Sequence, residues 1–403
     1  MLTVAAALKL VLDHCQPLPV LQVPTAEALG LVLAEEVQSD IDSPPHDRAI
    51  VDGYAVQAAD LASGHAQLEV LEEVTAGALP TRSVARSQAT RVMTGAPIPT
   101  GADAMVMVER TRLDPTGRIV QIAVEKVAVG QNIMRRATSM RRGQTVLAAG
   151  ASIRPIEIGL LAEVGRTHIS VVPRPTVAIL ATGNELVPAD KMPAAGQIRN
   201  SNGPLLIACA QRAGGVPRDL GIGRDDRDEL LRLLGEGLKC DVLVISGGVS
   251  AGVLDLVPGV LAELGVEQIF HKVQLKPGKP LWFGVQRHDS RQTLVFGLPG
   301  NPVSSLVCFE LFARPALGRL AGRGDAGLQR LTARLTAPYT HRGDRPTYHP
   351  ARHSFVDGGW HVEPLAWRGS GDLCTLSNAT ALASFPAGDR QYAAGESIEI
   401  AVI

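Results

Sequence analysis

The chain is poor in aromatic residues, which make up 3% of its 403 residues, and its five cysteines include no Cys-x-x-Cys pair. Neither a disulfide framework nor a zinc site is therefore indicated. A run of about 18 apolar residues, the length of a membrane-spanning helix, is also missing. The N-terminus lacks the basic region and cleavage site of a signal peptide. We expect a soluble, cytoplasmic protein with reduced thiols and no membrane partner.

The chain also has little net charge, since 39 Lys and Arg balance 40 Asp and Glu to give −1. This balance argues against nucleic acid as a partner. Glycine and proline are abundant, at 41 and 27 residues, and indicate many turns. A chain of this length is expected to fold as roughly two to four domains.

The first half of the sequence predicts two domains. Residues 1–40 contain two helical patterns, the second starting at Ala26 with Thr25 as its cap. In residues 41–142, short apolar segments alternate with Gly, Pro and Asp, which is typical of a β domain. Another helix is predicted from Pro155 onward. Residues 143–172 are therefore expected to join residues 1–40 in a discontinuous helical linker domain.

The second half predicts an α/β domain and a β-barrel. Between residues 173 and 325, apolar strands at 175–183, 240–248 and 293–298 alternate with helical patterns, which indicates a parallel sheet covered on both faces. Residues 326–403 return to short strands and turns, as in a small β-barrel. The fold class is a multidomain α/β plus β protein.

Three of the predicted strands end in loops rich in glycine and polar residues: ATGNEL, SGGVSAGVLD and PGNPVSS. Ligands bind outside the carboxyl ends of the strands in an open parallel sheet. We therefore expect the three loops to meet at one edge.

The loop FGLPGNPVSS suits an oxyanion. Asn301 is a good N-cap, Pro302 fits the first helical position, and Pro299 stiffens the entry. Ser304 adds a hydroxyl to a helix end that presents N–H groups and a positive dipole. The alternative is a tight, well-capped strand-to-helix turn.

The loop SGGVSAGVLD follows the same logic. Its Ser246, Gly247, Gly248 and Ser250 can form a nest of donors, with Asp255 just beyond. Because a carboxylate beside an anion nest is electrostatically unfavourable, a bridging Mg²⁺ is indicated. Asp255 alternatively caps the next helix.

Further acidic and basic candidates flank these loops. Glu185 is either a second metal ligand or a solvated acid, whereas Asp225 is free to face the cleft if Asp226 caps the following helix. Lys276 and Lys279 in LKPGKP either neutralise a multiply charged substrate or belong to a solvated turn.

Two nucleotide-binding motifs are missing. No Walker A motif is present and GIGRDD lacks the third glycine of a dinucleotide fingerprint, which argues against an ATPase or a dehydrogenase.

In order, the chain contains the segments SPPHDRAIVDGYAV, RVMTGAPIPTGAD, ATGNEL, IRNSN, SGGVSAGVLD, LKPGKP and GLPGNPVS. Together they resemble the molybdopterin molybdenumtransferase family, which includes the E-domain of gephyrin. The resemblance implies a homodimer whose cleft lies between the α/β domain of one subunit and the β domain of the other. It also implies that adenylylated molybdopterin receives molybdate and that AMP leaves with the help of Mg²⁺. A molybdopterin adenylyltransferase and recipient molybdoenzymes are the implied partners.

The resemblance also implies residue roles. Asp52, Thr94, Glu185, Asp225 and Asp255 match metal, molybdate or catalytic groups; of these, Asp52, Thr94 and Asp255 are the catalytic candidates and Glu185, Asp225 and Asp255 the metal ligands. Ser250, Lys276, Lys279, Pro299, Asn301 and Pro302 match the surroundings of the pterin phosphate and the nucleotide, and Arg345 and Ser370 match positions near the cleft.

The sequence departs from the family pattern at three charged positions. Ser139 and Val253 stand where carboxylates are common, and Pro350 where an arginine is common. A non-catalytic homologue that binds molybdopterin and hands it on is therefore an alternative to the enzyme. An enzyme acting on a sugar phosphate or nucleotide is a third hypothesis.

Overall fold

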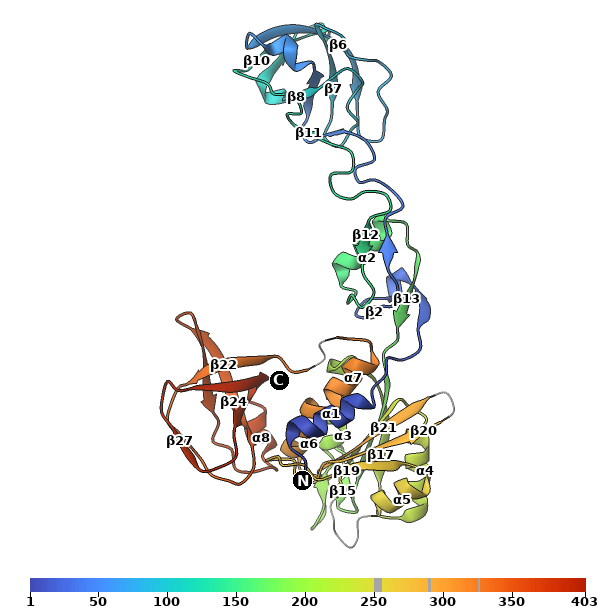
Figure 1. Cartoon of the computed structure of the whole chain (residues 1–403), viewed down its shortest axis with the longest axis vertical. Coiled ribbons are helices and arrows are strands. Elements are labelled where there is room, and N and C mark those ends of the chain that lie inside the picture. The colour runs from blue at the N-terminus through green and yellow to red at the C-terminus, as the bar shows by residue number, and fades with distance from the viewer. Residues whose placement is uncertain (250–255, 289–290, 325–326) are drawn as a thin grey trace.

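The computed structural model describes residues 1–249, 256–288, 291–324 and 327–403. Ser250, Val253 and Asp255, which the sequence singled out, lie outside the described residues. The molecule is elongated: a β domain occupies one end, a small linker domain the middle, and the α/β domain and C-terminal barrel lie together at the other end (Figure 1). In the described ranges, no helix combines the length and apolar character needed to cross a membrane.

The β domain is built on a six-stranded sheet with the order β8-β5-β7-β6-β10-β9. The strands are β5 (Gly53–Val56), β6 (His65–Val74), β7 (Gln88–Val92), β8 (Ala104–Met107), β9 (Thr111–Leu113) and β10 (Ile119–Ala123). Alternate residues of these strands, among them Tyr54, Leu68 and Ile122, form its buried core. The sequence prediction of short strands in this region is confirmed.

In the linker domain, strand β13 (His168–Val172) lies between β1 (Leu21–Pro24) and β2 (Val32–Leu33). Helix α2 (Pro155–Glu163) starts at the predicted proline. The helix predicted from Ala26 is wrong, because only the 3₁₀ turn η1 (Thr25–Glu27) forms. Gly30 adopts a φ of +78°, and the residues after it pair with β13 instead. The Thr25 hydroxyl donates to the Arg166 carbonyl, 2.6 Å away, rather than capping a helix.

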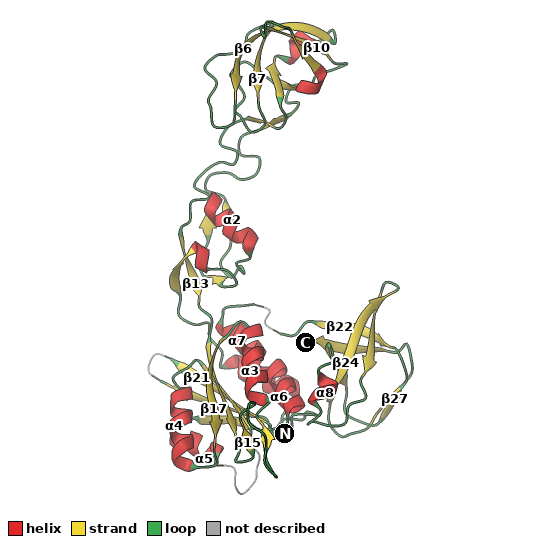
Figure 2. Cartoon of the chain, turned by 180° about the vertical axis from the view of Figure 1, so that it is seen from behind, coloured by secondary structure: helices red, strands yellow, loops and turns green. Residues whose placement is uncertain are grey.

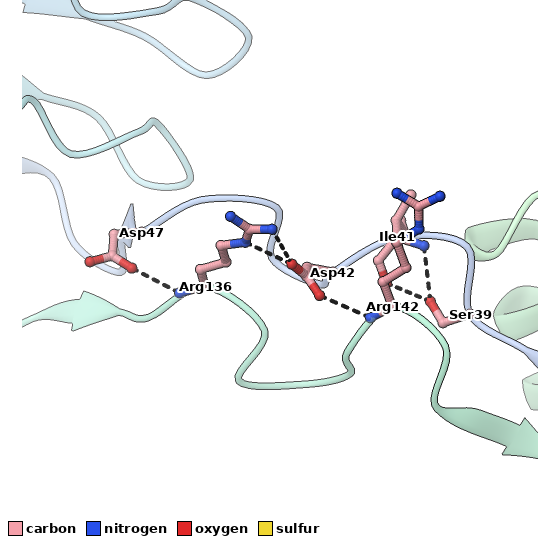
Figure 3. Close-up of polar contacts among 6 residues, drawn as sticks. All are labelled: Ser39, Ile41, Asp42, Asp47, Arg136 and Arg142. Carbon is pink, nitrogen blue, oxygen red and sulfur yellow. Dashed lines mark hydrogen bonds and ion pairs between the residues drawn. The ribbon is translucent and has the colours of Figure 1, made fainter.

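Two chain passes connect the linker and β domains, and we call residues 39–47 and 135–143 the neck (Figure 3). Asp42 accepts hydrogen bonds from the Arg142 N–H at 2.9 Å and from Nε of Arg136 at 2.7 Å. Asp47 accepts from the Arg136 N–H at 2.8 Å. These bonds, led by the one from the Arg142 backbone, hold the pKa of Asp42 below its usual range. The two carboxylates thus tie one pass to the other.

Short strand pairs lie on both sides of the neck. On the β domain side, β4 (Arg48–Ala49) pairs with β11 (Ile133–Met134), and on the linker side β3 (Val37–Gln38) pairs with β12 (Thr145–Leu147).

The α/β domain has a six-stranded sheet of order β17-β14-β18-β21-β20-β19. Strands β17 (Val216–Gly223), β14 (Thr176–Thr182), β18 (Val242–Ser246) and β21 (Gln292–Leu298) are parallel, as predicted. However, β20 (Trp282–Arg287) runs antiparallel to both of its neighbours, β21 and β19 (Glu267–His271), so the prediction of an all-parallel sheet is corrected at this edge. The connection between them is too short for a crossover helix.

Helices cover both faces of this sheet, as predicted (Figure 2). One face carries α3 (Asn202–Arg212), α6 (Pro302–Cys308) and α7 (Arg314–Leu320), and the other carries α4 (Arg227–Gly237) and α5 (Val257–Glu263). Helix α1 (Val4–Asp13) joins the first group, with Ala7 and Val11 buried in that core, whereas the sequence placed it with the linker.

The helix that the sequence predicts to start at Pro302 is divided by a π-helical segment, Phe309–Ala313, between α6 and α7. Within it Glu310 is 1% exposed. Its carboxylate accepts from Arg212 on α3 at 2.5 Å and from Arg314 at 2.9 Å. A buried carboxylate held by two guanidinium groups therefore fixes the π-helical segment and the start of α7 against α3.

The C-terminal domain is a closed five-stranded barrel of order β22-β25-β24-β26-β28, which confirms the predicted β-barrel. Its strands are β22 (Arg330–Leu335), β24 (Thr347–Val356), β25 (Gly359–Pro364), β26 (Ala381–Phe385) and β28 (Ser397–Val402); β23 (Tyr339–His341) and β27 (Arg390–Tyr392) form a separate ribbon. The short helix α8 (Leu373–Leu376) contacts α6, which brings the barrel against the α/β domain.

Candidate functional site

A cavity of about 530 Å³ opens at the carboxyl edge of the parallel strands. It is lined by Ala181, Thr182, Gly183, Glu185, Leu186, Ile198, Arg199, Asn200, Ser201, Asn202, Asp225, Ser246, Gly247, Gly248, Gly300, Asn301, Pro302, Gly371 and Leu373. Most of these residues come from the ends of β14, β18 and β21, the start of α3 and the loop into α8. The others come from the ribbon of β15 (Leu186–Val187) and β16 (Ile198–Arg199) and, for Asp225, from the loop before α4. The expected convergence of the three loops is therefore confirmed for the described residues.

Sheet register explains the convergence. Ala181 of β14 pairs with Ser246 of β18, which in turn pairs with Leu298 of β21. Neighbouring parallel strands thus end at the same level of the sheet. The three loops that follow them therefore lie side by side.

The two glycines after β18 are required by the backbone. Gly247 and Gly248 have φ values of +95° and +63°. A β-carbon at Gly247 would lie 2.6 Å from the Thr182 carbonyl oxygen, and one at Gly248 would lie 2.8 Å from the Thr182 Oγ1. The Gly247 N–H already donates to the Leu298 carbonyl at 3.1 Å, so it is not part of an open anion nest.

The start of α6 is less open to an anion than the sequence suggested. Asn301 occupies the N-cap position, but its side chain makes no capping hydrogen bond and is exposed at the cavity. Pro302 has no N–H, and the Val303 N–H donates to the Ser370 carbonyl at 3.0 Å. Ser304 is only 4% exposed and does not line the cavity, which corrects the expectation that its hydroxyl faces a ligand. Pro299 does not line the cavity either, and its carbonyl accepts from Ser305.

The cavity carries two exposed carboxylates, Glu185 and Asp225. The Glu185 carboxylate folds back over Gly183, where a β-carbon would lie 2.4 Å from Oε2. Asp226 caps α4 by accepting from the Glu229 N–H at 2.9 Å, as predicted, which leaves Asp225 at the cavity. Arg224 fixes the loop by donating to two carbonyls, those of Asn184 and Leu186, each at 3.0 Å.

These carboxylates fit a partial Mg²⁺ shell, because Mg²⁺ is usually held by one or two carboxylates together with water and phosphate oxygens. Within the described ranges, no group of three His, Cys, Asp or Glu side chains is placed to hold a metal. Asp255, the third predicted ligand, lies outside the described residues.

Asp52 and Thr94 are adjacent to one another but lie in the β domain, at the opposite end of the molecule from the cavity (Figure 1). Both are exposed. The Thr94 N–H and hydroxyl each donate to Oδ1 of Asp52 at 2.7 Å, and these bonds lower the pKa of the carboxyl. A single chain does not bring this pair to the cavity.

The predicted basic residues lie where the barrel meets the α/β domain. The Lys276 backbone carbonyl accepts from the Tyr348 N–H at 2.9 Å, and Nη1 of Arg345 donates to the Leu275 carbonyl at 3.1 Å. Lys279 is exposed on the same loop. Lys276, Lys279 and Arg345 do not line the cavity. Ser370 does not line it either, although the next residue, Gly371, does. Burial, followed by the charge of Lys276, lowers the pKa of His341 beside this junction.

Sequence reasoning did not single out several polar or flexible contributors to the cavity, among them Thr182, Arg199, Asn200, Ser201, Asn202 and Gly371. Asn202 could have been identified from the sequence, because the segment IRNSN places an asparagine between a short strand and a predicted helix. Gly371 gave no signal, since its place depends on how the barrel docks.

Comparisons with known proteins cover the three parts of the chain. Residues 2–165 match the MoeA N-terminal region (domain I and II), residues 178–319 a probable molybdopterin binding domain, and residues 332–403 the MoeA C-terminal region (domain IV).

Relatives that align over nearly the whole chain point to the same family as the three matched regions. A protein of Staphylococcus aureus (strain Mu50) named molybdopterin molybdenumtransferase is 31% identical, covering 98% of this chain and 94% of its own. One of that name from Bacillus subtilis (strain 168) is 32% identical over 94% of this chain and 88% of its own. The solved structure of a molybdopterin biosynthesis MoeA protein from Pyrococcus horikoshii superposes with a TM-score of 0.82 at 31% identity, covering 100% of this chain and 99% of that one.

Proposed function

The chain belongs to the MoeA family of molybdopterin molybdenumtransferases, enzymes of molybdenum cofactor biosynthesis, and we propose that it inserts molybdate into adenylylated molybdopterin with Mg²⁺-dependent release of AMP. The cavity at the strand ends is the observation that supports this reaction. It joins strand-end loops, the start of α3 and the loop before α8 around two carboxylates. The two carboxylates suit a metal-dependent reaction, and the lining also offers the polar side chains of Arg199, Asn200 and Asn202 to a heterocyclic substrate.

Mg²⁺ would be held by Glu185 and Asp225, with Asp255 as the third proposed ligand. When bound, it neutralises charge on phosphate oxygens. The protein residues do the rest: Arg224 keeps the acidic loop in place, and Gly247 and Gly248 let the backbone approach the substrate closely. Lys276, Lys279 and Arg345 supply positive charge at the domain junction, where a multiply charged substrate extends from the cavity.

A homodimer would complete this site. Asp52 and Thr94 belong to the β domain, which lies at the far end of the molecule from the α/β domain that holds the cavity (Figure 2). A second copy arranged head to tail would bring its β domain over the α/β domain of the first. The Asp52 carboxylate, kept ionised by Thr94, would then face the substrate as the catalytic group.

The surrounding biology follows from this chemistry. The substrate must come from an adenylyltransferase acting on molybdopterin, and the product must pass to molybdoenzymes that use the finished cofactor. We place these exchanges in the cytoplasm.

The test is AMP release from adenylylated molybdopterin in Mg²⁺, with and without molybdate. Molybdate-dependent release is expected. Tight binding without release would support the second candidate, a molybdopterin carrier. One observation favours that candidate: Ser139 stands where the family commonly has a carboxylate, and its N–H donates to the Ser43 carbonyl at 2.9 Å, which fixes the neck and supplies no charge to a ligand. Failure to bind the substrate at all would contradict both functions.

A further inference from the structure

The cavity contains a buried amide whose two N–H groups are both in use. Asn202, the first residue of α3, lines the cavity and is 8% exposed. Its Nδ2 donates to Oγ of Ser246 at 2.7 Å and to the Gly300 carbonyl oxygen at 2.6 Å. The side chain therefore bridges the ends of β18 and β21, and only its oxygen is left to interact with anything else.

The orientation of this amide is fixed by its neighbours. The Gly300 carbonyl oxygen accepts and cannot donate, so the group facing it must be Nδ2. Ser305 donates its hydroxyl to the Pro299 carbonyl and can then accept from Ser246, whose Oγ lies 3.4 Å away. Ser246 in turn accepts from Asn202. Turning the amide over would place two acceptors against each other at Gly300.

The remaining oxygen, Oδ1 of Asn202, is buried and has no hydrogen-bond partner among the described residues. Oγ1 of Thr182, from the neighbouring strand end, is in the same state. Leaving a buried polar group unpaired destabilises a protein, and such groups in folded chains are therefore rare. Since both residues line one cavity, a bound molecule is the natural source of the missing partner.

The chemistry of Oδ1 selects the group that it binds. Phosphate and molybdate offer acceptor oxygens at neutral pH, and these cannot pair with an acceptor. The carboxylates of Glu185 and Asp225 further disfavour a bare anion here. Mg²⁺ retains several waters when bound, which an oxygen shielded from solvent does not accommodate. A neutral N–H or O–H donor of the substrate remains, and an amino group at the edge of a flat ring supplies such a donor.

We propose that Asn202 recognises an amino group on a heterocyclic ring of the substrate, with the Thr182 hydroxyl as a second polar contact to the same ring. The inference rests on the proposed function, because adenylylated molybdopterin carries two such rings, a pterin and an adenine. It places a ring between β14 and α3 and leaves the phosphates to the outer part of the site.

The experiment is calorimetric binding of two ligand pairs to the full-length protein. One pair is 6-hydroxymethylpterin and 6-hydroxymethyllumazine, which has an oxo group in place of the amine. The other is AMP and purine riboside 5′-monophosphate, which lacks the 6-amino group. The wild-type protein is expected to prefer the amine in one pair by about 10- to 100-fold, because the analogue leaves Oδ1 unpaired. The pair that shows the preference identifies the ring.

Asn202→Ala is expected to abolish the preference. Gln211→Ala is the matched control: it removes an exposed amide from the other end of the same helix, α3, and Gln211 does not line the cavity, so the preference should persist.

Three results would overturn the inference. The first is equal affinity of the wild-type protein for both members of each ligand pair, a result that is measured without any variant. The second is an equal loss of affinity for both members of a pair in Asn202→Ala. The third is weakened Mg²⁺ binding in that variant with the preference intact, which would make Asn202 a metal ligand. Binding is measured without turnover, so absent AMP release would count against the proposed function and leave this test standing.

Discussion

Asp52 accepts two hydrogen bonds from one residue, Thr94, through its N–H and its hydroxyl, each 2.7 Å from the same carboxylate oxygen. Both donors stabilise the ionised form, and the pKa of Asp52 falls below its usual range as a result.

The first prediction concerns this pair. Thr94→Val removes the hydroxyl and keeps the backbone donor, so the pKa of Asp52 should rise part of the way to its ordinary value. Because the pKa is depressed, the charge on Asp52 persists as pH falls through the ordinary carboxyl range and is lost only below it. The variant should lose that charge at a higher pH. Carbon-detected NMR titration of Asp52 checks the shift; an unchanged pKa would mean that the hydroxyl contributes nothing.

The second prediction concerns where the two halves of the site come from. Asp52→Asn and Glu185→Gln should each lower AMP release by at least about 100-fold when tested alone. After co-refolding at equal amounts, about a quarter of the sites should combine an intact β domain with an intact cavity if each site uses two chains. Activity of the mixture measures this. Were the mixture as inactive as its components, each site would belong to a single chain.

The third prediction concerns the buried carboxylate Glu310. Glu310→Ala leaves Arg212 and Arg314 without their shared partner and opens a hole beside the π-helical segment. We expect unfolding free energy to fall by about 3 kcal/mol, the lower end for a broken buried ion pair, because both arginines are partly exposed. Chemical denaturation gives the value.

The matched control for this variant is the exposed pair of Arg218 and Glu236, at 3.0 Å. Glu236→Ala should cost less than about 1 kcal/mol. Equal losses in the two variants would show that burial of Glu310 adds nothing.

The fourth prediction concerns Gly247. Alanine there meets the Thr182 carbonyl at 2.6 Å and a φ of +95°, so we expect a loss of about 2 kcal/mol or more and a distorted cavity. Gly235→Ala in α4 has no atom within 4 Å of the new carbon and should stabilise by up to about 1 kcal/mol. Thermal unfolding of both variants tests the contrast.

The fifth prediction concerns the neck. Asp42→Asn weakens the bonds to Arg136 and Arg142, so the Arg142 amide should exchange with deuterium faster while the β domain core remains protected (Figure 3). The depressed pKa of Asp42 means that the wild-type contact survives as pH falls to the ordinary carboxyl range and fails only below it. Asp40→Asn, at an exposed neighbour, should leave the exchange rate unchanged.

Sequence alone was most informative where local pattern and tertiary structure agree. The run that became β14 is almost wholly buried, so an apolar strand bounded by turn residues could be recognised. The run after Thr25 has helical spacing as well, but its apolar residues pair with β13 instead, and no local pattern reports a partner more than a hundred residues away. The antiparallel direction of β20 was hidden for the same reason.

The residues of the site also fall into those that sequence could place and those that it could not. Glu185, Asp225 and Gly247 follow strands of a parallel sheet, and topology alone brings them together. Ser304 was misplaced because the first turn of a helix has both an inner and an outer face, and sequence does not say which one a serine takes. The role of Asn202 depends on hydrogen bonds to two other loops, which become visible only once the chain is folded.

The packing of α1 against α7 bears on how the chain folds during synthesis. The β domain is complete when its last strand has left the ribosome, and domains generally fold in that N- to C-terminal order. Helix α1 emerges first, yet the elements that it packs against, the π-helical segment and α7, are the last of the α/β domain to be made. For most of translation its apolar face is therefore exposed, and a nascent chain stalled before α7 should be the state in which chaperones bind the first helix.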